Sequence, residues 1–288
     1  MTRRLVLTAD DLGVHPAADR EILALLAEGA ISATTMIVVA PASAETARLL
    51  RATGGGVEPR LHVALTRPRE PFDAGRTPAG ALPWRPLGRG TGTLTDATGA
   101  FPVDPATVVA HGSAADVTAE LAAQLAWMRA AGLRPTGLDS HSGVLYGQHG
   151  LLEAALRFCA EHGLAFRLPR SLGSTLGASL SPAARTGHVE ALALADELGV
   201  RLPETIATAW LPGAALESYE QLRATYLDAL VALPEGTSEV FCHPAPEEAT
   251  TGLPPAEARK RSWELRLLRD PTFTDALGRE GIEVVPTW

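Results

Sequence analysis

The chain has 288 residues, 46% of them hydrophobic, and carries a formal net charge of −8 with a pI near 5.5. Lysine and arginine form no long cluster, which argues against a nucleic-acid or anionic-membrane partner and favours a neutral or small substrate. No segment is apolar enough to span a membrane and the first residues show no secretory signal, so we expect a cytoplasmic protein. Cys159 and Cys242 lie far apart in apolar segments, which is typical of buried thiols in a reducing compartment.

The first elements alternate between apolar strands and helices. Residues 5–9 form an apolar run that ends in Asp10 and Asp11, as a buried parallel strand does when it delivers charged side chains to its C-terminal edge. A helical repeat over residues 16–28 stops at Gly29, as expected for a C-terminal glycine. This order requires crossover connections and therefore predicts a parallel sheet. The next expected elements are a strand, a helix and a strand over residues 35–40, 44–52 and 60–65.

Regular patterning lapses between residues 66 and 113, where Pro, Gly, Thr and Arg dominate. A stretch of this length without periodicity is typical of a long irregular loop, either an active-site lid or a disordered insert. Trp84 favours an ordered cover, since an exposed indole gains by stacking on a sugar ring or by packing on the mouth of the fold. The alternative is that Trp84 only anchors the loop to the core. The exposed-looking apolar residues of this loop also suggest a homodimer.

Alternation resumes after the loop and continues to the end of the chain. The whole pattern gives about eight short strands separated by helices, with no linker long enough to divide domains. We therefore expect an α/β fold in which residues 1–288 form a single (β/α) TIM-like barrel domain. The remaining expected helices cover residues 116–131, 151–162, 183–198, 217–233 and 255–268, and the remaining expected strands cover residues 134–138, 164–168, 205–210, 239–242 and 282–285.

Residues of metal-binding or acid–base type stand at the ends of four expected strands. Because the C-terminal ends of barrel strands meet at one mouth, we expect these residues to converge. Neighbouring strand residues point to opposite faces, so Asp10 and Asp11 are expected to have different roles. The six candidates, in chain order, are Asp10, Asp11, His62, Asp139, His141 and His243.

A carboxylate and two imidazoles are a usual set of three ligands for a catalytic divalent metal that keeps an open position for water. Such a metal lowers the pKa of its water and polarises the carbonyl under attack. Amide hydrolysis also needs a base for the proton of the water and an acid for the leaving amine, roles that a second carboxylate and an unliganded histidine can fill. A further carboxylate, Asp139, would orient the imidazole of His141, its near neighbour in the chain. The pattern predicts a metal-assisted hydrolase with one divalent ion.

Each candidate also has a purely structural interpretation. Asp10 or Asp11 could cap the helix that follows, because aspartate is favoured at helix N-termini. His62 on an apolar strand could be a satisfied core histidine, His141 could be a turn residue, and His243 could mark the end of a strand. The functional interpretation is favoured because residues of metal-binding or acid–base type stand at the ends of four strands that are far apart in the sequence.

The serine between Asp139 and His141 raises the alternative of a Ser-His-Asp hydrolase. Adjacent residues on a strand cannot fold onto one another as nucleophile, base and orienting acid, and the chain has no Gly-x-Ser-x-Gly elbow. We therefore reject this alternative. The remaining histidines are expected to be solvated, with His149 the strongest exception because it closely follows the Asp-Ser-His segment; they are His15, His111, His149, His162 and His188.

Four short segments carry the candidate residues: Thr-Ala-Asp-Asp-Leu-Gly at 8–13, Leu-His-Val-Ala-Leu-Thr at 61–66, Arg-Pro-Thr-Gly-Leu-Asp-Ser-His at 134–141 and Glu-Val-Phe-Cys-His-Pro at 239–244. In this order and spacing they resemble the motifs of the YdjC-like carbohydrate deacetylases. Arg-Ser-Trp-Glu-Leu at 261–265, followed by Gly-Ile-Glu-Val at 281–284, is similar to the closing helix and strand of that family. The resemblance spans nearly the whole chain and implies a distorted (β/α) barrel.

The resemblance also implies roles for individual residues. Asp11, His62 and His141 would bind the divalent metal, Asp10 would be the general base, and His243 would act as acid or stabilise the leaving group. Members of the family remove the acetyl group from N-acetylated sugars such as short chitin oligosaccharides. Zinc and magnesium are the leading ions, and cobalt, nickel, iron or manganese also suit two imidazoles and a carboxylate.

One segment departs from the family pattern. Many members continue with further histidines at alternating positions, whereas this chain reads His-Ser-Gly-Val-Leu-Tyr at 141–146. The change leaves the metal triad intact but alters contacts near Gly143 and Leu145, and makes Tyr146, with Trp84, a candidate substrate-loop residue. We expect a metal-dependent N-deacetylase of a sugar or short oligosaccharide. The alternatives are a non-catalytic sugar-binding or regulatory barrel and a metal-dependent barrel enzyme acting on another bond.

Overall fold

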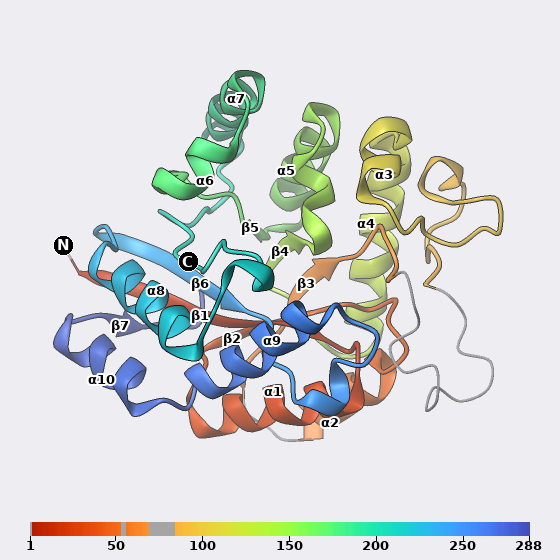
Figure 1. Ribbon diagram of the computed structural model, residues 1–288. Coiled ribbons are helices and arrows are strands. Elements are labelled where there is room, and N and C mark those ends of the chain that lie inside the picture. Colours follow the sequence, from red (N-terminus) through yellow and green to blue (C-terminus); the bar gives the residue numbers. More distant parts are fainter. Residues whose placement is uncertain (1, 53–55, 69–83) are drawn as a thin grey trace.

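A curled sheet of parallel strands forms the centre of the molecule (Figure 1). The computed structural model describes residues 2–52, 56–68 and 84–288. Within these residues the strands are β1 (Arg3–Leu12), β2 (Ala33–Met36), β3 (Arg60–Val63), β4 (Gly137–Ser140), β5 (Ala165–Phe166), β6 (Gly236–Cys242) and β7 (Glu283–Val284). The sheet order is β5-β4-β3-β2-β1-β6, and β7 pairs with the first part of β1. Every pair is parallel, as the alternation of strands and helices predicted.

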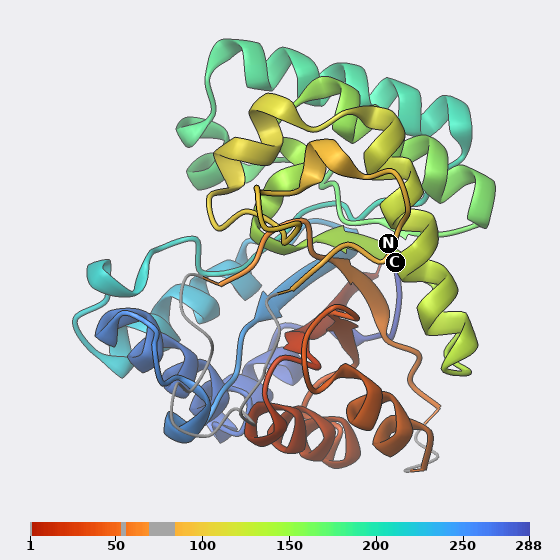
Figure 2. The same cartoon turned by 90° about the vertical axis from the view of Figure 1, so that its right-hand side faces the viewer.

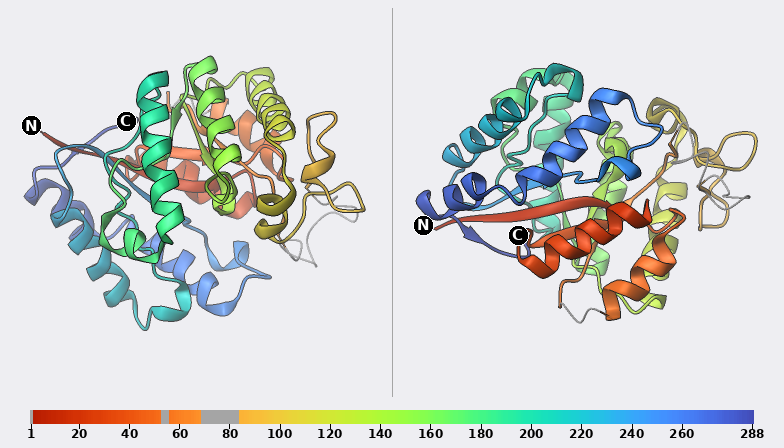
Figure 3. Two further views of the ribbon diagram at one scale, coloured as in Figure 1. Left: turned by 90° about the horizontal axis from the view of Figure 1, so that it is seen from above. Right: turned by 60° about the horizontal axis from the view of Figure 1, so that its bottom comes forward.

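Helices cover the outside of this sheet. In the described residues they are α1 (Pro16–Glu28), α2 (Ser43–Ala52), α3 (Pro105–His111), α4 (Ala114–Ala130), α5 (His149–His162), α6 (Gly173–Ser179), α7 (Pro182–Leu198), α8 (Tyr219–Val231), α9 (Pro255–Leu267) and α10 (Pro271–Arg279). Figure 2 shows α1 and α2 on one side of the strands, and Figure 3 shows α4, α5 and α7 side by side on the other, where they pack on one another. The fold is an α/β half-barrel, the open and distorted form of the expected barrel.

The first helix illustrates how local sequence sets element boundaries. The side chain of His15 accepts a hydrogen bond from the amide of Ala17, and Pro16 occupies the first turn, where its missing amide proton is not needed. Gly29 ends the helix at a φ of 70°, in the left-handed conformation that glycine adopts without strain. The capping interpretation of Asp10 and Asp11 is therefore wrong, because His15 fills that position.

The sheet does not close through an eighth strand. The strand expected over residues 205–210 is present only as two isolated bridges, which join Thr205 to Ser171 beyond β5 and Ile206 to Glu239 of β6. Backbone hydrogen bonds of residues 201–207 to both edges of the sheet bridge the gap. The expectation of about eight strands is wrong by one for the described residues, because this segment follows the sheet edges too irregularly to form a ladder.

Several strand boundaries differ from the prediction. The strand expected at 35–40 is Ala33–Met36, and the strand expected at 134–138 is Gly137–Ser140. The second shift places Asp139 inside β4, and the first strand likewise contains Asp10 and Asp11. In an apolar sequence pattern, a charged residue is normally taken to mark the end of the strand. Here the strands continue through the charged residues, because the interior of the half-barrel supplies partners for their charges.

The loop expected at 66–113 contains regular structure. Its described part includes a 3₁₀ turn at Gly92–Leu94 and helix α3, and residues 69–83 of the prediction lie outside the described residues. Trp84 is 6% exposed, and Leu94 and Phe101 are fully buried. These side chains anchor the segment to the core, whereas Leu87 in the same segment is 42% exposed, and the homodimer stays a prediction.

Both cysteines are unpaired and buried, as expected. Among the described residues, no helix combines the length and apolarity needed to cross a membrane.

A buried aspartate beneath the first turn weakens the fold at neutral pH. The Asp19 carboxylate, 1% exposed, accepts hydrogen bonds from the Gly13 amide at 2.7 Å and the Thr46 hydroxyl at 2.5 Å. Burial raises the pKa of Asp19 from its ordinary value of 3.8 to about 6. Between pH 4 and 6 the folded protein therefore holds a proton that the unfolded chain releases, so stability falls as the pH rises through this window.

We expect Asp19→Asn to remove this fall and to raise the free energy of unfolding at pH 7 by about 1–3 kcal/mol, since one pKa unit corresponds to about 1.4 kcal/mol. Asparagine keeps an oxygen for the Gly13 amide, and its amide group can donate to Thr46, whose hydroxyl also donates to the Ala42 carbonyl. Urea unfolding of metal-stripped protein at pH 4, 5, 6 and 7 measures the effect. An unchanged difference between variant and wild type across these pH values would contradict it.

Candidate active site

A bulge in β1 directs two adjacent carboxylates to one place. The pairing of β1 with β2 shifts register between Ala9 and Leu12, and Asp11 has a φ of 70°. Bulges redirect side chains, and aspartate tolerates the left-handed conformation better than most residues. Asp10 and Asp11 therefore do not simply point to opposite faces: each has a carboxylate oxygen within 4.8 Å of a ring nitrogen of His62.

Asp11, His62 and His141 form a cluster with the geometry of a cation site. Asp11 Oδ1 lies 3.5 Å from His62 Nε2 and 3.5 Å from His141 Nδ1. This oxygen is buried and has no hydrogen-bond partner, while Asp11 Oδ2 accepts a hydrogen bond from Arg261 at 2.8 Å. A buried carboxylate oxygen between two ring nitrogens is the donor set that a divalent ion requires.

Asp139 contacts His62 rather than the nearby His141. The register of β3 and β4 sets His62 directly opposite Asp139, and His62 Nδ1 donates a short hydrogen bond to the Asp139 carboxylate. This bond fixes the tautomer in which His62 Nε2 faces Asp11, as a carboxylate behind a liganding imidazole does. The sequence interpretation attached Asp139 to His141, its neighbour in the chain; the sheet register attaches it to His62.

Asp10 is held by an arginine that sequence analysis missed. The guanidinium of Arg167 donates to both carboxylate oxygens of Asp10, at 2.6 and 2.8 Å, and the Thr35 hydroxyl donates at 2.9 Å. Burial alone raises the pKa of Asp10, but the charge of Arg167 outweighs it and holds the pKa well below its usual range. Asp10 is therefore a fixed carboxylate.

Two more buried charges continue this network below the site. Glu239 accepts hydrogen bonds from Arg167 and from Arg60, and the Arg60 guanidinium lies 3.9 Å from the centre of the Trp288 ring. Sequence analysis missed Arg60, Arg167 and Glu239. Arg60 and Glu239 stand at the first position of expected strands, and Arg167 alone interrupts an apolar strand with a charge.

His243 reaches the same place from the end of β6. Its ring lies edge-on to Phe241, with the centroids 5.6 Å apart, and its backbone amide donates to Glu264 at 2.8 Å. Burial lowers the pKa of His243, although the nearby carboxylates of Asp11 and Asp10 favour its protonated form. The side chain is therefore neutral at neutral pH.

The charge pattern decides between two cation sites that share His62. The alternative group of Asp10, His62 and Asp139 has its carboxylates beside the Arg167 guanidinium, which disfavours a cation there. In the group with Asp11, the unpartnered Oδ1 faces two ring nitrogens, whereas Asp139 Oδ2, which also has no hydrogen bond, lies 3.0 Å from the Arg167 guanidinium. Around both sites, four carboxylates face three guanidiniums, and the raised pKa of His62 means that its protonated ring offsets the one remaining negative charge; an ion that displaced this proton would take over that role. The groups are Asp10, Asp11, Asp139 and Glu239 against Arg60, Arg167 and Arg261.

A cavity of about 750 Å³ opens onto these residues. Asp10, His62, His141 and His243 line it, and so does Tyr146, whose hydroxyl donates to the Arg167 carbonyl at 2.7 Å. Trp84 is not among the described residues that line the cavity: it is buried, with its ring centroid 5.9 Å from that of His141, which favours the anchor interpretation over a cover on the substrate.

Two of the remaining histidines, His149 and His188, line the cavity, although His188 was expected to be solvated. His15 caps α1, and His188 contacts the Pro169 carbonyl at 2.8 Å. His149 lines the cavity although its side chain is largely exposed, as its place after the Asp-Ser-His segment suggested.

Comparison with known proteins gives this geometry a family. A family model described as YdjC-like protein matches residues 4–279, nearly the whole chain. The chain belongs to the YdjC-like family. The resemblance found in its four motifs is thereby confirmed.

Two relatives match the YdjC-like chain over its full length. A carbohydrate deacetylase of Geobacillus stearothermophilus is 25% identical over 289 residues, which cover 99% of this chain and 97% of that protein. A crystal structure of an Enterococcus faecalis V583 protein, described as proposed to cleave cellobiose phosphate, superposes with a TM-score of 0.77 at 24% identity and covers 99% of this chain and 97% of that one. The second comparison shows a shared fold.

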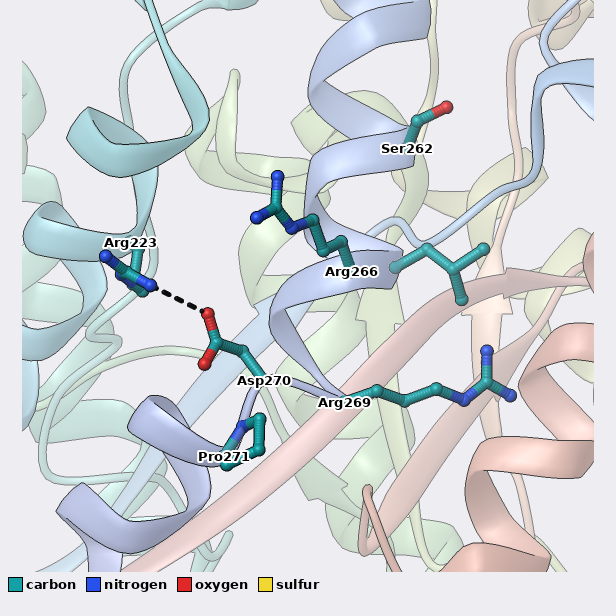
Figure 4. Close-up of a pocket in the computed structure, with 7 residues that line it drawn as sticks. Arg223, Ser262, Arg266, Arg269, Asp270 and Pro271 are labelled. Atoms are coloured by element: carbon teal, nitrogen blue, oxygen red, sulfur yellow. Dashed lines mark hydrogen bonds and ion pairs between the residues drawn. The ribbon is translucent and has the colours of Figure 1, made fainter.

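A second hollow of about 630 Å³ in this YdjC-like protein lacks comparable chemistry (Figure 4). Arg223 pairs with Asp270 at 3.1 Å, as the dashed line in Figure 4 marks, and Arg269 pairs with two glutamates of α1. Arg266 lies over the ring of Tyr219 at 3.7 Å. Its cations are thus already engaged, and none of its lining residues is a histidine.

The charges around His62 would couple the binding of an ion there to proton release. Burial by itself lowers the pKa of His62, but the carboxylates of Asp139 and Asp10 overcome this and raise the pKa to about 10. An ion at Nε2 must displace that proton, so we expect zinc affinity of the stripped protein to rise about tenfold per pH unit from pH 6 to 8. Calorimetry in buffers of different ionisation enthalpy should detect about one proton released at His62 per ion.

Asp139→Asn is the matched variant for this coupling. It removes a charge that raises the pKa of His62, so the pH dependence of zinc affinity should become shallower. Affinity at pH 7 should fall about 10- to 100-fold, the usual effect of removing a group that orients a ligand. Equal pH slopes in wild type and variant would show that His62 is not the group displaced.

Proposed function

We propose that this protein is a divalent-metal-dependent hydrolase that removes the acetyl group from an N-acetylated sugar or short oligosaccharide. The observation that carries the proposal is the cluster of Asp11, His62 and His141, with its unpartnered buried oxygen. Two of its members, His62 and His141, line one cavity together with the fixed carboxylate of Asp10. Membership of the YdjC-like family and the full-length similarity to a carbohydrate deacetylase support the reaction and the substrate class.

The donor set favours one class of ion. Two imidazoles and one carboxylate suit zinc, cobalt, nickel, iron or manganese better than magnesium, which prefers oxygen ligands and retained water. When bound, such an ion lowers the pKa of a water molecule and polarises the amide carbonyl. Asp11, His62 and His141 would hold it, and Asp139 would keep His62 in the binding tautomer.

Asp10 would accept the proton of the attacking water. Arg167 keeps this carboxylate ionised and immobile. Thr35 and Arg167 both donate to Oδ1, whereas Oδ2 accepts only from Arg167 and keeps a second lone pair for a water proton. A carboxylate with so low a pKa is a weak base, so it suits a water whose own acidity has been raised. We therefore propose Arg167 as a positioning residue for Asp10.

His243 would supply the proton that the leaving amine needs. Water adds to the carbonyl carbon, the carbon–nitrogen bond breaks, and the nitrogen leaves as an amine after protonation, with acetate as the other product. Since burial leaves His243 neutral at neutral pH, it must first take up a proton, and the lowered pKa then makes it a stronger acid. Arg261, paired with Asp11, lies close enough to affect His243 and lines the same cavity.

The identity of the sugar depends on the segment that lacks the family's extra histidines. Ser142 and Gly143 line the cavity and adopt left-handed φ values of 54° and 67°, so a tight turn occupies this part of the wall. We propose that the natural sugar differs from diacetylchitobiose at the group that faces this turn. We also propose that residues 1–288 form one catalytic domain that works in the cytoplasm.

The experiment that tests the function is acetate release from N-acetylglucosamine and its oligomers by purified protein. The protein is stripped with chelator and resupplied with single divalent ions. Acetate that appears only with an ion supports the proposal. Turnover by the stripped protein contradicts it, and saturable sugar binding without acetate for any ion or sugar would favour a binding protein instead.

A further inference from the structure

One exposed tryptophan stands in the wall of the catalytic cavity. Trp210 is 37% exposed and lines the cavity, together with Phe241 and His243. Of the exposed large apolar side chains in the described chain, Tyr146 is the other one that lines it, and the Tyr146 hydroxyl is engaged with Arg167. An exposed indole retains a large apolar surface that a ligand can cover.

The backbone around Trp210 is fixed from two sides. Lys260 of α9 donates hydrogen bonds to the carbonyls on either side of Trp210, those of Ala209 at 3.1 Å and Leu211 at 2.9 Å. The Thr208 hydroxyl donates to the Phe241 carbonyl of β6. A side chain presented on so constrained a segment loses little conformational freedom when a ligand covers it.

Ring contacts connect Trp210 to the reacting groups. Its ring meets Phe241 edge-on, with centroids 5.7 Å apart at 84°, and Phe241 meets His243 in the same way. The Arg167 guanidinium that holds Asp10 lies 4.8 Å from the Phe241 ring centre. The Phe241 ring therefore links Trp210 to the proposed acid, His243, and to Arg167, which holds the proposed base, and Trp210, His243 and Asp10 all line the same cavity.

The cavity also offers a different surface to an apolar chain. Leu168, Leu172, Leu176 and Leu180 line it from the segment between β5 and α7. Trp210 belongs instead to the wall formed with Phe241 and His243, where an alkyl chain would cover a polar imidazole. A pyranose ring suits that wall, because its apolar face can cover an indole while its hydroxyl rim bonds to polar neighbours.

We propose that Trp210 is the platform on which a pyranose ring of the substrate stacks. The proposal rests on the function proposed above and moves the sugar-stacking role expected for Trp84 to a residue that the sequence did not single out. Trp210 then sets binding and orientation of the sugar, whereas proton transfer is left to Asp10 and His243.

Binding of diacetylchitobiose, measured by calorimetry in the Asp10→Asn background to prevent turnover, tests the platform. We expect Trp210→Ala to weaken binding about tenfold and Trp210→Phe to stay within about threefold, because phenylalanine keeps an aromatic face. In the otherwise wild-type protein Trp210→Ala should raise KM about tenfold and change kcat little. Val231→Ala is the control, since Val231 is 62% exposed on α8 and does not line the cavity.

Each result of these binding and kinetic measurements either upholds or overturns the proposed role of Trp210. Binding of Trp210→Ala within twofold of the control overturns the platform, as does a variant that loses affinity for N-octylacetamide and keeps its affinity for the sugar. A drop in melting temperature that accounts for the loss would assign Trp210 a structural role and also overturn it. Sugar binding that depends on Trp210 in a protein that releases no acetate would uphold the platform and refute the deacetylase assignment.

Discussion

Replacing Asp11 with asparagine is expected to remove the bound divalent ion and to lower kcat for acetate release at least about a thousandfold, because a catalytic ion contributes several kcal/mol to the transition state. The asparagine side chain has nearly the same size as aspartate and tolerates the φ of 70° at this position, so the bulge in β1 should survive. Metal content after dialysis and acetate release with saturating sugar measure the two effects.

Asp19→Asn is the matched control for this substitution. It also neutralises a buried aspartate close to the first turn, yet Asp19 belongs to neither carboxylate cluster of the described residues. The control should bind the ion and turn over sugar like the wild type. Full activity of Asp11→Asn without a stoichiometric ion would contradict the assignment of Asp11, and would leave the reaction without the site that we propose for it.

Asp10→Asn is expected to keep the ion and lose turnover. General bases contribute about 10²–10⁴-fold, so kcat should fall within that range while ion affinity changes less than about threefold. The oxygen of the new amide can still accept one hydrogen bond from Arg167, which also pairs with Asp139 and Glu239, so the fold should persist. Single-turnover rates, ion affinity and melting temperature separate these effects.

Results that contradict this prediction would bear on the alternative cation site. If Asp10→Asn loses the ion together with activity, the ion lies in the group of Asp10, His62 and Asp139, and the charge argument against that group is wrong. If Asp10→Asn retains turnover, the base is another residue, and His243, neutral at neutral pH, becomes the first to examine.

Much of the site followed from the ends of elements. His62, His141 and His243 each stand where an apolar strand ends, and a parallel sheet brings such ends together whatever the loops do. The structure brings Asp11, His62 and His141 within ligand distance of one another. Their convergence was predictable because it depends on strand polarity, which the local sequence pattern reveals.

The partners of these residues were not predictable in the same way. Arg167 contacts Asp10, which is 157 positions away, and Arg60 contacts Glu239, which is 179 positions away. Such pairs leave no periodic trace in the sequence, since each charge alone reads as the end of a strand. The attachment of Asp139 to His62 depended on the register of two strands, and register is set by packing.

The two tryptophans illustrate the same limit. From the sequence, an indole in a glycine- and proline-rich segment is expected to be covered by something. For Trp84 the cover is the protein's own core, in which the side chain is buried. Trp210 had no distinguishing local signal. Its exposure depends on Lys260 and Thr208, which hold its backbone between α9 and β6.

The sequence by itself determined the family, the parallel α/β class and the residue types at the mouth, because apolar periodicity and strand-end chemistry are local properties. Tertiary structure alone decided which oxygen of Asp11 stays unpartnered, which guanidinium holds Asp10, how the sheet edges are bridged and which indole faces the cavity. These depend on distances between segments far apart in the chain, and a bulge or a shift of one residue in register changes them while the sequence pattern stays the same.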